Sequence, residues 1–155
     1  MSDWLAPDWP LPAGVRALCT TREGGVSAGA CQSLNLGDHV GDDPASVRTN
    51  RARLEAALGA HPVFLQQVHG TELLTLDGRT ADGAAADACT TVEPGVACTI
   101  MVADCLPVLF TDAAGRRVAA AHAGWRGLAA GVLERTVAAF EGEGGAPALM
   151  AWLGP

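Results

Sequence analysis

Three apolar runs in this chain each end on a side chain that can bind a metal ion or act as a nucleophile, and a turn-forming residue follows each run within two positions. The runs and their followers are residues 63–69 ending on His69 before Gly70, residues 96–105 ending on Cys105 before Pro107, and residues 118–122 ending on His122 before Gly124. Open α/β sheets build their sites from reactive groups at strand ends. The pattern therefore predicts a sheet with three reactive side chains gathered at one edge.

The composition indicates one compact α/β domain spanning residues 1–155. Hydrophobic residues make up 49% of the chain and charged residues 17%, which is typical of a folded protein with a substantial core. A length of 155 residues suits one domain better than two.

The charge balance bears on the class of partner. The chain carries 10 Lys and Arg against 17 Asp and Glu, for a formal net charge of -7. Nucleic acids and anionic membranes both favour clustered basic residues, so we expect neither as a partner. Aromatic residues are only 5% and Tyr is absent, which disfavours a stacking platform for single strands. Local groups could still hold a small anionic ligand.

The first residues show no export signal, because the start is acidic and interrupted by prolines rather than basic and apolar. The five cysteines form no Cys-x-x-Cys pair, and without export they are expected to be reduced thiols. We therefore expect a cytoplasmic location.

Two stretches have helical periodicity. Asp43-Pro44 supplies an N-cap acceptor and a proline at the first helical position, and Gly59 can end that helix. A second helix is expected directly after Gly124, with one apolar face, before a glycine-rich end at residues 142–145.

Strand-like segments occupy residues 16–21, 90–92 and 149–153. The second and third apolar runs flank a turn at residues 112–115, so we expect them to pair as a hairpin. The whole predicts an α/β fold: a mixed sheet with flanking helices.

His69, Cys105 and His122 are the candidate site. Two imidazoles and a thiolate can form a three-ligand metal site with a vacant position, or a Cys–His nucleophile pair. The separations between them match no short metal motif, so the spacing does not choose between these.

Other polar residues beside these runs have two interpretations each. Arg126 lies at the expected helix start, where it is either a clamp for phosphate or carboxylate or a solvated first-turn residue. Gln67 shares a strand face with His69 and either contacts a ligand or caps an edge. Asp104 either orients Cys105 or acts as a capping group. Arg22 lies in a glycine-containing turn and is either a ligand contact or merely exposed.

Several motifs occur in a recognisable order. They are residues 20–27 (TTREGGVS), 33–37 (SLNLG), 67–70 (QVHG), 103–108 (ADCLPV), 122–127 (HAGWRG) and 152–155 (WLGP). In this order they resemble the YfiH-like laccase-domain or polyphenol oxidase family, members of which are described as purine nucleoside phosphorylases. Domains of that family continue for several dozen residues beyond the Leu-Gly-Pro motif, so we expect this chain to lack the C-terminal portion.

The resemblance implies a zinc ion bound by His69, Cys105 and His122, which would be the catalytic residues. It also implies phosphorolysis of adenosine, inosine and methylthioadenosine, with adenosine deamination as a side activity. The residues expected to bind substrate or phosphate are Arg22, Asn35, Gln67 and Arg126. The oligomeric state is left open.

Besides phosphorolysis, three other functions are compatible with these residues or with the name of the family. A metal-free Cys–His hydrolase of the amidase type would use Cys105 as nucleophile with His69 or His122 as base. A copper oxidase is disfavoured, because a multicopper cluster needs many imidazoles and the chain has 4 histidines. A closed structural zinc site would need Cys89 or Cys98 as a fourth ligand, and no spacing nominates either.

Overall fold

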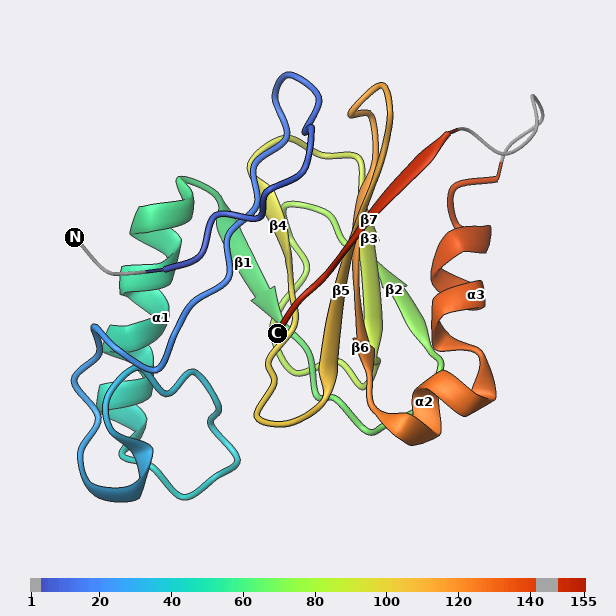
Figure 1. The fold of residues 1–155 in the computed structure, drawn as a ribbon. Coiled ribbons are helices and arrows are strands. Elements are labelled where there is room, and N and C mark those ends of the chain that lie inside the picture. Colours follow the sequence, from blue (N-terminus) through green and yellow to red (C-terminus); the bar gives the residue numbers. More distant parts are fainter. Residues whose placement is uncertain (1–3, 142–147) are drawn as a thin grey trace. The chain divides into compact units, whose positions relative to one another are not determined.

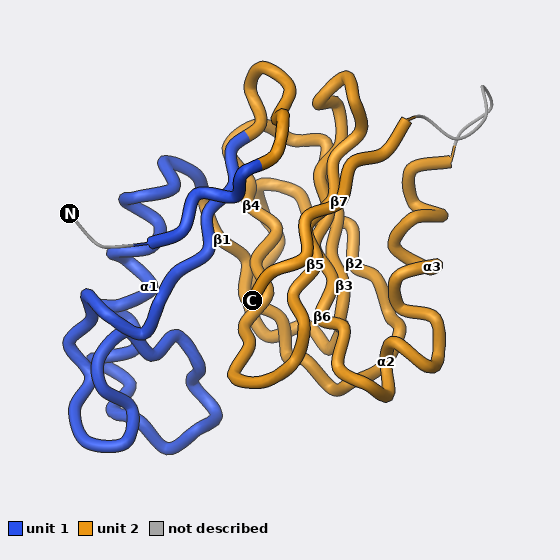
Figure 2. Tube along the Cα trace, viewed as in Figure 1, with its two compact units in different colours: residues 1–8, 16–60 blue, residues 9–15, 61–155 orange. Residues whose placement is uncertain are grey.

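The computed structural model describes residues 4–141 and 148–155. The chain divides into two compact units, shown in Figure 2: unit 1 comprises residues 1–8 and 16–60, and unit 2 comprises residues 9–15 and 61–155. Among the described residues, no helix combines the length and the apolar character needed to cross a membrane.

Unit 1 is built around helix α1 (Pro44–Leu58), with a short 3-10 turn, η1 (Gly29–Cys31), in the loop before it. The predicted caps of α1 are confirmed: the Asp43 side chain accepts hydrogen bonds from the amides of Ala45 and Ser46, and Gly59 ends the helix with φ 65°. The predicted strand at residues 16–21 is wrong. Cys19 forms only an isolated bridge with Leu5, because no neighbouring strand continues the pairing.

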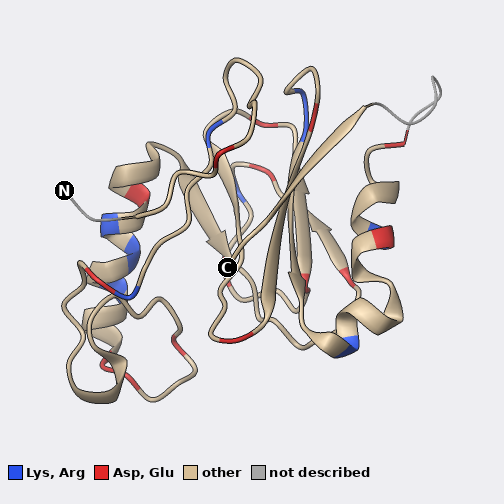
Figure 3. Cartoon of the chain, in the orientation of Figure 1, with Lys and Arg blue, Asp and Glu red and all other residues tan. Residues whose placement is uncertain are grey.

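Two arginines of α1 make hydrogen bonds to the loops of their own unit. Figure 3 colours the basic positions of this helix, whose sequence includes Arg48, Arg51 and Arg53. Arg51 donates to the carbonyl of Leu36 and Arg53 to that of Gly24. These bonds fasten the loop of residues 24–36 to the helix.

Unit 2 has a five-stranded sheet in the order β2-β3-β6-β5-β7 and a two-stranded parallel sheet, β1-β4 (Figure 1). The strands are β1 (His61–Phe64), β2 (Leu73–Thr75), β3 (Ala88–Thr91), β4 (Val96–Thr99), β5 (Leu106–Asp112), β6 (Val118–Ala123) and β7 (Leu149–Leu153). In the larger sheet β2 and β3 are parallel and the other neighbours are antiparallel. The predicted α/β class with a mixed sheet is therefore confirmed.

Strand β6 lies in the middle of unit 2 and is buried on both faces. Ala119, Ala121 and Ala123 belong to a core cluster with Val132 and Phe140, from the helical side. Ala120 belongs to a second cluster with Val63 of β1, on the opposite face (Figure 1). Small side chains at alternate positions let both layers pack closely on this strand.

The predicted second helix is two short helices, α2 (Trp125–Ala130) and α3 (Val132–Ala138). Gly131 separates them with φ 98°, a left-handed conformation that interrupts the helix. The apolar periodicity of the predicted helix continues across this break, since Val132 and Phe140 are both buried. The glycine-rich end predicted at residues 142–145 lies outside the described residues.

The apolar runs form strands differently from the prediction. β1 stops at Phe64, five residues before His69, and the second run is divided between β4 and the loop that leads to β5. Cys105 therefore precedes a strand instead of ending one. Only His122 lies near the carboxyl end of its own strand. The turn at residues 112–115 does join a hairpin, but the partner of β6 is β5, which begins after the second run; β4, the strand within that run, pairs with β1 instead.

Candidate metal centre

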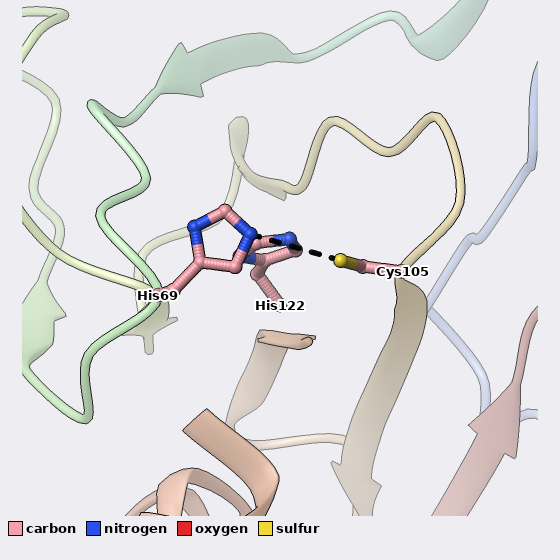
Figure 4. A group of neighbouring side chains, drawn as sticks. All are labelled: His69, Cys105 and His122. Atoms are coloured by element: carbon pink, nitrogen blue, oxygen red, sulfur yellow. Dashed lines mark hydrogen bonds between the residues drawn. The ribbon is translucent and has the colours of Figure 1, made fainter. Parts of the chain in front are cut away.

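Three side chains from separate segments of unit 2 point toward one another (Figure 4). One ligand atom from each of His69, Cys105 and His122 lies within 4.8 Å of the others. Cys105 Sγ is 3.8 Å from His69 Nε2, and the two imidazole rings meet edge to face with centroids 4.8 Å apart. His69 is exposed, Cys105 is half-buried and His122 is buried, so the group is open on one side.

Antiparallel pairing places Cys105 beside His122. In the β5–β6 pair, Leu106 lies opposite Ala123 and Pro107 opposite His122. The start of β5 therefore lies next to the end of β6, and the residue before β5 reaches the same end of the sheet as His122. The prediction of a shared edge holds for this pair, although the strand direction at Cys105 is reversed.

Asp87, directly before β3, is the partner of His122. The β3–β6 register continues to this point, since the amide of His122 donates to the carbonyl of Asp87 at 2.7 Å. In addition, His122 Nδ1 lies 2.8 Å from Asp87 Oδ1. A carboxylate at Nδ1 leaves Nε2 as the nitrogen of His122 that can bind a metal ion.

The same carboxylate holds the turn that carries His69. The amides of Val68, His69 and Gly70 donate to the two carboxylate oxygens at 3.1, 2.9 and 2.7 Å. His69 has φ 61°, the only positive φ at a non-glycine among the described residues. Left-handed backbone is uncommon for such residues and needs support from its surroundings.

Gln67 joins this turn to the loop before Cys105. Its side-chain amide donates to the carbonyl of Met101 at 2.7 Å and accepts from the amide of Met101 at 2.8 Å. Both polar ends of Gln67 are therefore committed to the backbone. Its predicted substrate contact is untested, and the observed contacts give it a structural role.

Gly124 provides the space in which the site assembles. A Cβ at this position would lie 2.8 Å from His69 Cδ2 and 3.0 Å from Cys105 Sγ, closer than packed atoms tolerate. Gly127 allows a second close approach, because its Cβ would lie 2.9 Å from the carbonyl oxygen of Gly70. Because Gly124 and Gly127 lack a Cβ, the start of α2 can lie against the turn that carries His69.

The surroundings of the site shift the pKa values of two of its groups, Asp87 and Cys105. Burial raises the pKa of Asp87, but the hydrogen bonds from His122 and from the backbone amides outweigh it, and the pKa is lowered overall. Burial raises the pKa of Cys105, and the charge of Asp104, a hydrogen bond to Asp104 and the charge of Asp87 act in the same direction. Because nucleophilic cysteines need a lowered pKa, this setting opposes a metal-free Cys–His pair.

The donor set fits a zinc ion. Zn–N bonds of about 2.0 Å and Zn–S bonds of about 2.3 Å in a tetrahedron put the ligand atoms roughly 3.5 Å apart. The 3.8 Å between Cys105 Sγ and His69 Nε2 is close to this value, and no two of the three ligand atoms lie more than 4.8 Å apart. A bound metal cation also favours the thiolate, which offsets the raised pKa of Cys105.

The other predicted residues divide between the two units. Arg22 and Asn35 belong to unit 1, where Arg22 donates to the carbonyl of Gln32 and Asn35 hydrogen-bonds to Asp42 and Gly37. Arg126 is exposed on α2, with its guanidinium 4.4 Å from the centre of the Trp125 ring. Cys89 and Cys98 are outside the three-residue group, and all five cysteines are free thiols.

Asp87 is the residue that sequence reasoning missed. It stands alone among small apolar residues, within residues 84–89, and directly precedes the buried strand β3. A single acidic residue in such a segment must be paired if it is buried, and this signal was available. Its partner could not be read from the sequence, because His122 is 35 residues away.

Comparison with known proteins places this chain in a wider group. The family described as multi-copper polyphenol oxidoreductase laccase matches residues 16–155. A purine nucleoside phosphorylase of Pseudomonas aeruginosa is 57% identical over 100% of this chain and 62% of its own length. Purine nucleoside phosphorylase YfiH of Escherichia coli is 53% identical over 100% of this chain and 64% of its own. The chain thus spans less than two thirds of these curated relatives.

Solved structures agree with the fold. Protein NMB0706 of Neisseria meningitidis superposes with a TM-score of 0.91 and 50% identity, over 99% of this chain and 63% of that one. YlmD of Geobacillus stearothermophilus gives a TM-score of 0.86 and 35% identity, over 98% of this chain and 62% of that one. The likeness that the ordered motifs predicted is confirmed.

Proposed function

The chain belongs to the multi-copper polyphenol oxidoreductase laccase family, and we propose that it forms the metal-binding part of a zinc-dependent purine nucleoside phosphorylase. The observation that carries this proposal is the convergence of His69, Cys105 and His122, whose ligand atoms lie within 4.8 Å of one another. The names of relatives at 57% and 53% identity support the reaction class.

The donor atoms favour zinc over a copper cluster. One thiolate and two imidazoles suit a single zinc ion with an open fourth position. Only 4 histidines occur in the chain, too few for a multicopper centre. When bound, a zinc ion in this place supplies Lewis acidity that can polarise an oxygen or nitrogen atom of the nucleoside.

Phosphorolysis requires a nucleoside and a phosphate to be held together. A phosphate oxygen forms a bond to the anomeric carbon of the ribose while the bond from that carbon to the purine nitrogen breaks, and the base leaves with the electron pair and takes up a proton. We assign phosphate binding to Arg126, an exposed cation two residues after Gly124, which lines the site. Arg22 and Asn35 are proposed as further substrate contacts.

Adenosine, inosine and methylthioadenosine are the proposed nucleosides, with deamination of adenosine as a side reaction in which water replaces the 6-amino group. The opposing candidate is the metal-free hydrolase with Cys105 as nucleophile. The raised pKa of Cys105 and its acidic neighbours count against that candidate.

Metal analysis combined with a phosphate-dependent assay tests the proposal. The purified protein should contain about one equivalent of zinc, the occupancy of a single three-ligand site. It should release free base from inosine and adenosine only when phosphate is present. His122→Ala should remove both the zinc and the reaction, whereas His39→Ala, at an exposed histidine of unit 1, should keep both. Activity without bound metal that is blocked by thiol alkylation would support the hydrolase.

The assignment of Arg126 has its own test. Arg126→Ala should raise the KM for phosphate about ten-fold or more, since a charge-assisted pair contributes on the order of 1.5–3 kcal/mol. Arg135→Ala removes an exposed arginine of α3 and serves as the matched control. An unchanged KM for phosphate in Arg126→Ala would reject this role.

A further inference from the structure

Asp87 is fully buried and touches both histidines of the metal centre without being part of the ligand group. We propose that Asp87 is a positioning residue whose single carboxylate sets the geometry of both histidine ligands. This inference rests on the proposed metal-dependent function. It assigns a role to a residue that supplies no ligand and no substrate contact.

One part of the role concerns His122. The Asp87 carboxylate accepts a hydrogen bond from Nδ1 at 2.8 Å, which places the ring proton on Nδ1 and the free lone pair on Nε2. The backbone bond from His122 to Asp87, at 2.7 Å, fixes the two residues in register across the strands. Ring orientation and tautomer are thus set by the same neighbour.

The other part concerns His69. Three consecutive amides, from Val68 to Gly70, converge on the carboxylate at 2.7 to 3.1 Å. They hold His69 at φ 61°, and this backbone conformation directs its ring toward Cys105 (Figure 4). A negative charge is suited to this place because consecutive backbone amides form a concave binding site for anions.

The carboxylate has no capacity left for a metal ion. Oδ1 accepts from His69 N and His122 Nδ1, and Oδ2 accepts from the amides of Val68 and Gly70. Each oxygen therefore has two donors, which matches its two lone pairs. Asp87 thus acts on the metal ion only through the histidines.

The test compares two buried aspartates of unit 2. Asp87→Asn preserves the shape but removes the charge and one acceptor oxygen. We expect its zinc affinity, measured by competition with a chromophoric chelator, to fall about 10- to 100-fold. Asp112→Asn is the matched control, because Asp112 is also buried but pairs with Arg116 at the far end of β5. Its zinc affinity should stay within about two-fold of the wild type, as expected for a distant, independent site.

A second readout separates positioning from simple destabilisation. Cobalt substituted into the site reports ligand geometry through its visible absorption bands, and these should shift in Asp87→Asn while circular dichroism shows an intact fold. Loss of thermal stability in Asp87→Asn, with affinity and cobalt spectrum unchanged, would overturn the proposal.

If Asp87→Asn does not fold, the wild-type protein answers the question. Long-range proton–nitrogen NMR on the zinc-loaded protein should show His122 protonated at Nδ1 and metal-bound through Nε2. The reverse assignment would overturn the proposal.

Failure of the inference can be told from failure of the proposed function. A wild-type protein that binds zinc but releases no base from nucleosides contradicts the phosphorylase reaction alone. Equal zinc affinity in the wild type and Asp87→Asn contradicts the role of Asp87 alone. A wild-type protein that binds no zinc contradicts both.

Discussion

Asn50 in unit 1 and Asp87 in unit 2 are both fully buried, and each gathers hydrogen bonds from several segments of its own unit. The amide of Asn50 donates to Ser27 Oγ and to the carbonyls of Ser33 and Asn35, and its oxygen accepts from the amide of Val26. Asp87 only accepts, from three amides and one imidazole.

The comparison shows how charge distinguishes a buried residue that organises loops from one that also pairs with a candidate metal ligand. Asn50 carries donors and an acceptor, so its side chain can pair with both carbonyls and amides of the loops. Its own polar atoms are then used in hydrogen bonds within the unit. Asp87 must find donors for a full negative charge. One of them is a histidine, whose second nitrogen stays free to bind a metal ion. Four predictions sharpen or break this comparison.

The largest effect is expected when Asn50 is given the charge of Asp87. Asn50→Asp removes the donors to Ser27 Oγ and to the carbonyls of Ser33 and Asn35, and it buries a carboxylate charge where the wild-type oxygen accepts only from the amide of Val26. The free energy of unfolding should fall by about 3–5 kcal/mol in urea denaturation. Zinc affinity of the folded protein should not change. Thr49→Ala, on the exposed side of the same helix, is the control. A loss below about 1 kcal/mol would show that Asn50 is not the organising residue.

Next in size is the effect of filling the space at Gly124. Gly124→Ala places a methyl group 2.8 Å from His69 Cδ2 and should cost about 1–3 kcal/mol of stability. It should also weaken zinc binding, since His69 and Cys105 must separate. Gly78→Ala, where the nearest atom would be 3.5 Å away, should change neither quantity. Unchanged zinc affinity in Gly124→Ala would indicate that the site tolerates a wider geometry.

A smaller effect is expected at Gln67, the neutral amide beside the metal centre. Gln67→Ala removes two hydrogen bonds to Met101 and should lower stability by about 1–2 kcal/mol. Gln66→Ala, at the exposed neighbouring position, is the matched control in the same denaturation experiment. If Gln67 binds substrate instead, the variant will raise the KM for the nucleoside with little change in stability.

The smallest effect is expected from Asp42, the charged member of the unit 1 network. Hydrogen bonds from Ser27 and Asn35 lower the pKa of Asp42, so its contribution to stability is present above the unfolded pKa of about 3.9 and is lost as pH falls through the folded value. Wild type should therefore exceed Asp42→Asn in stability at neutral pH, and the gap should close on acidification. Urea midpoints at several pH values measure this, and a gap that does not depend on pH would contradict it.

Local signals in the sequence predicted the elements whose causes are local. Helix α1 begins at Asp43-Pro44 and ends at Gly59 as expected, because capping acts between residues a few positions apart. The break at Gly131 was missed, since a glycine within an apolar periodic pattern is compatible with a continuous helix until packing imposes a left-handed residue.

The sequence by itself determined which atoms could bind a metal ion, since His69, Cys105 and His122 each stand beside a turn-forming residue. Only the tertiary structure decided how they meet: antiparallel pairing of β5 with β6 brings Cys105 to His122, and Asp87 secures both histidines. The physical reason is range. Turns and caps depend on adjacent residues, whereas strand register and the partners of a buried charge depend on chain segments that meet only when the core has formed.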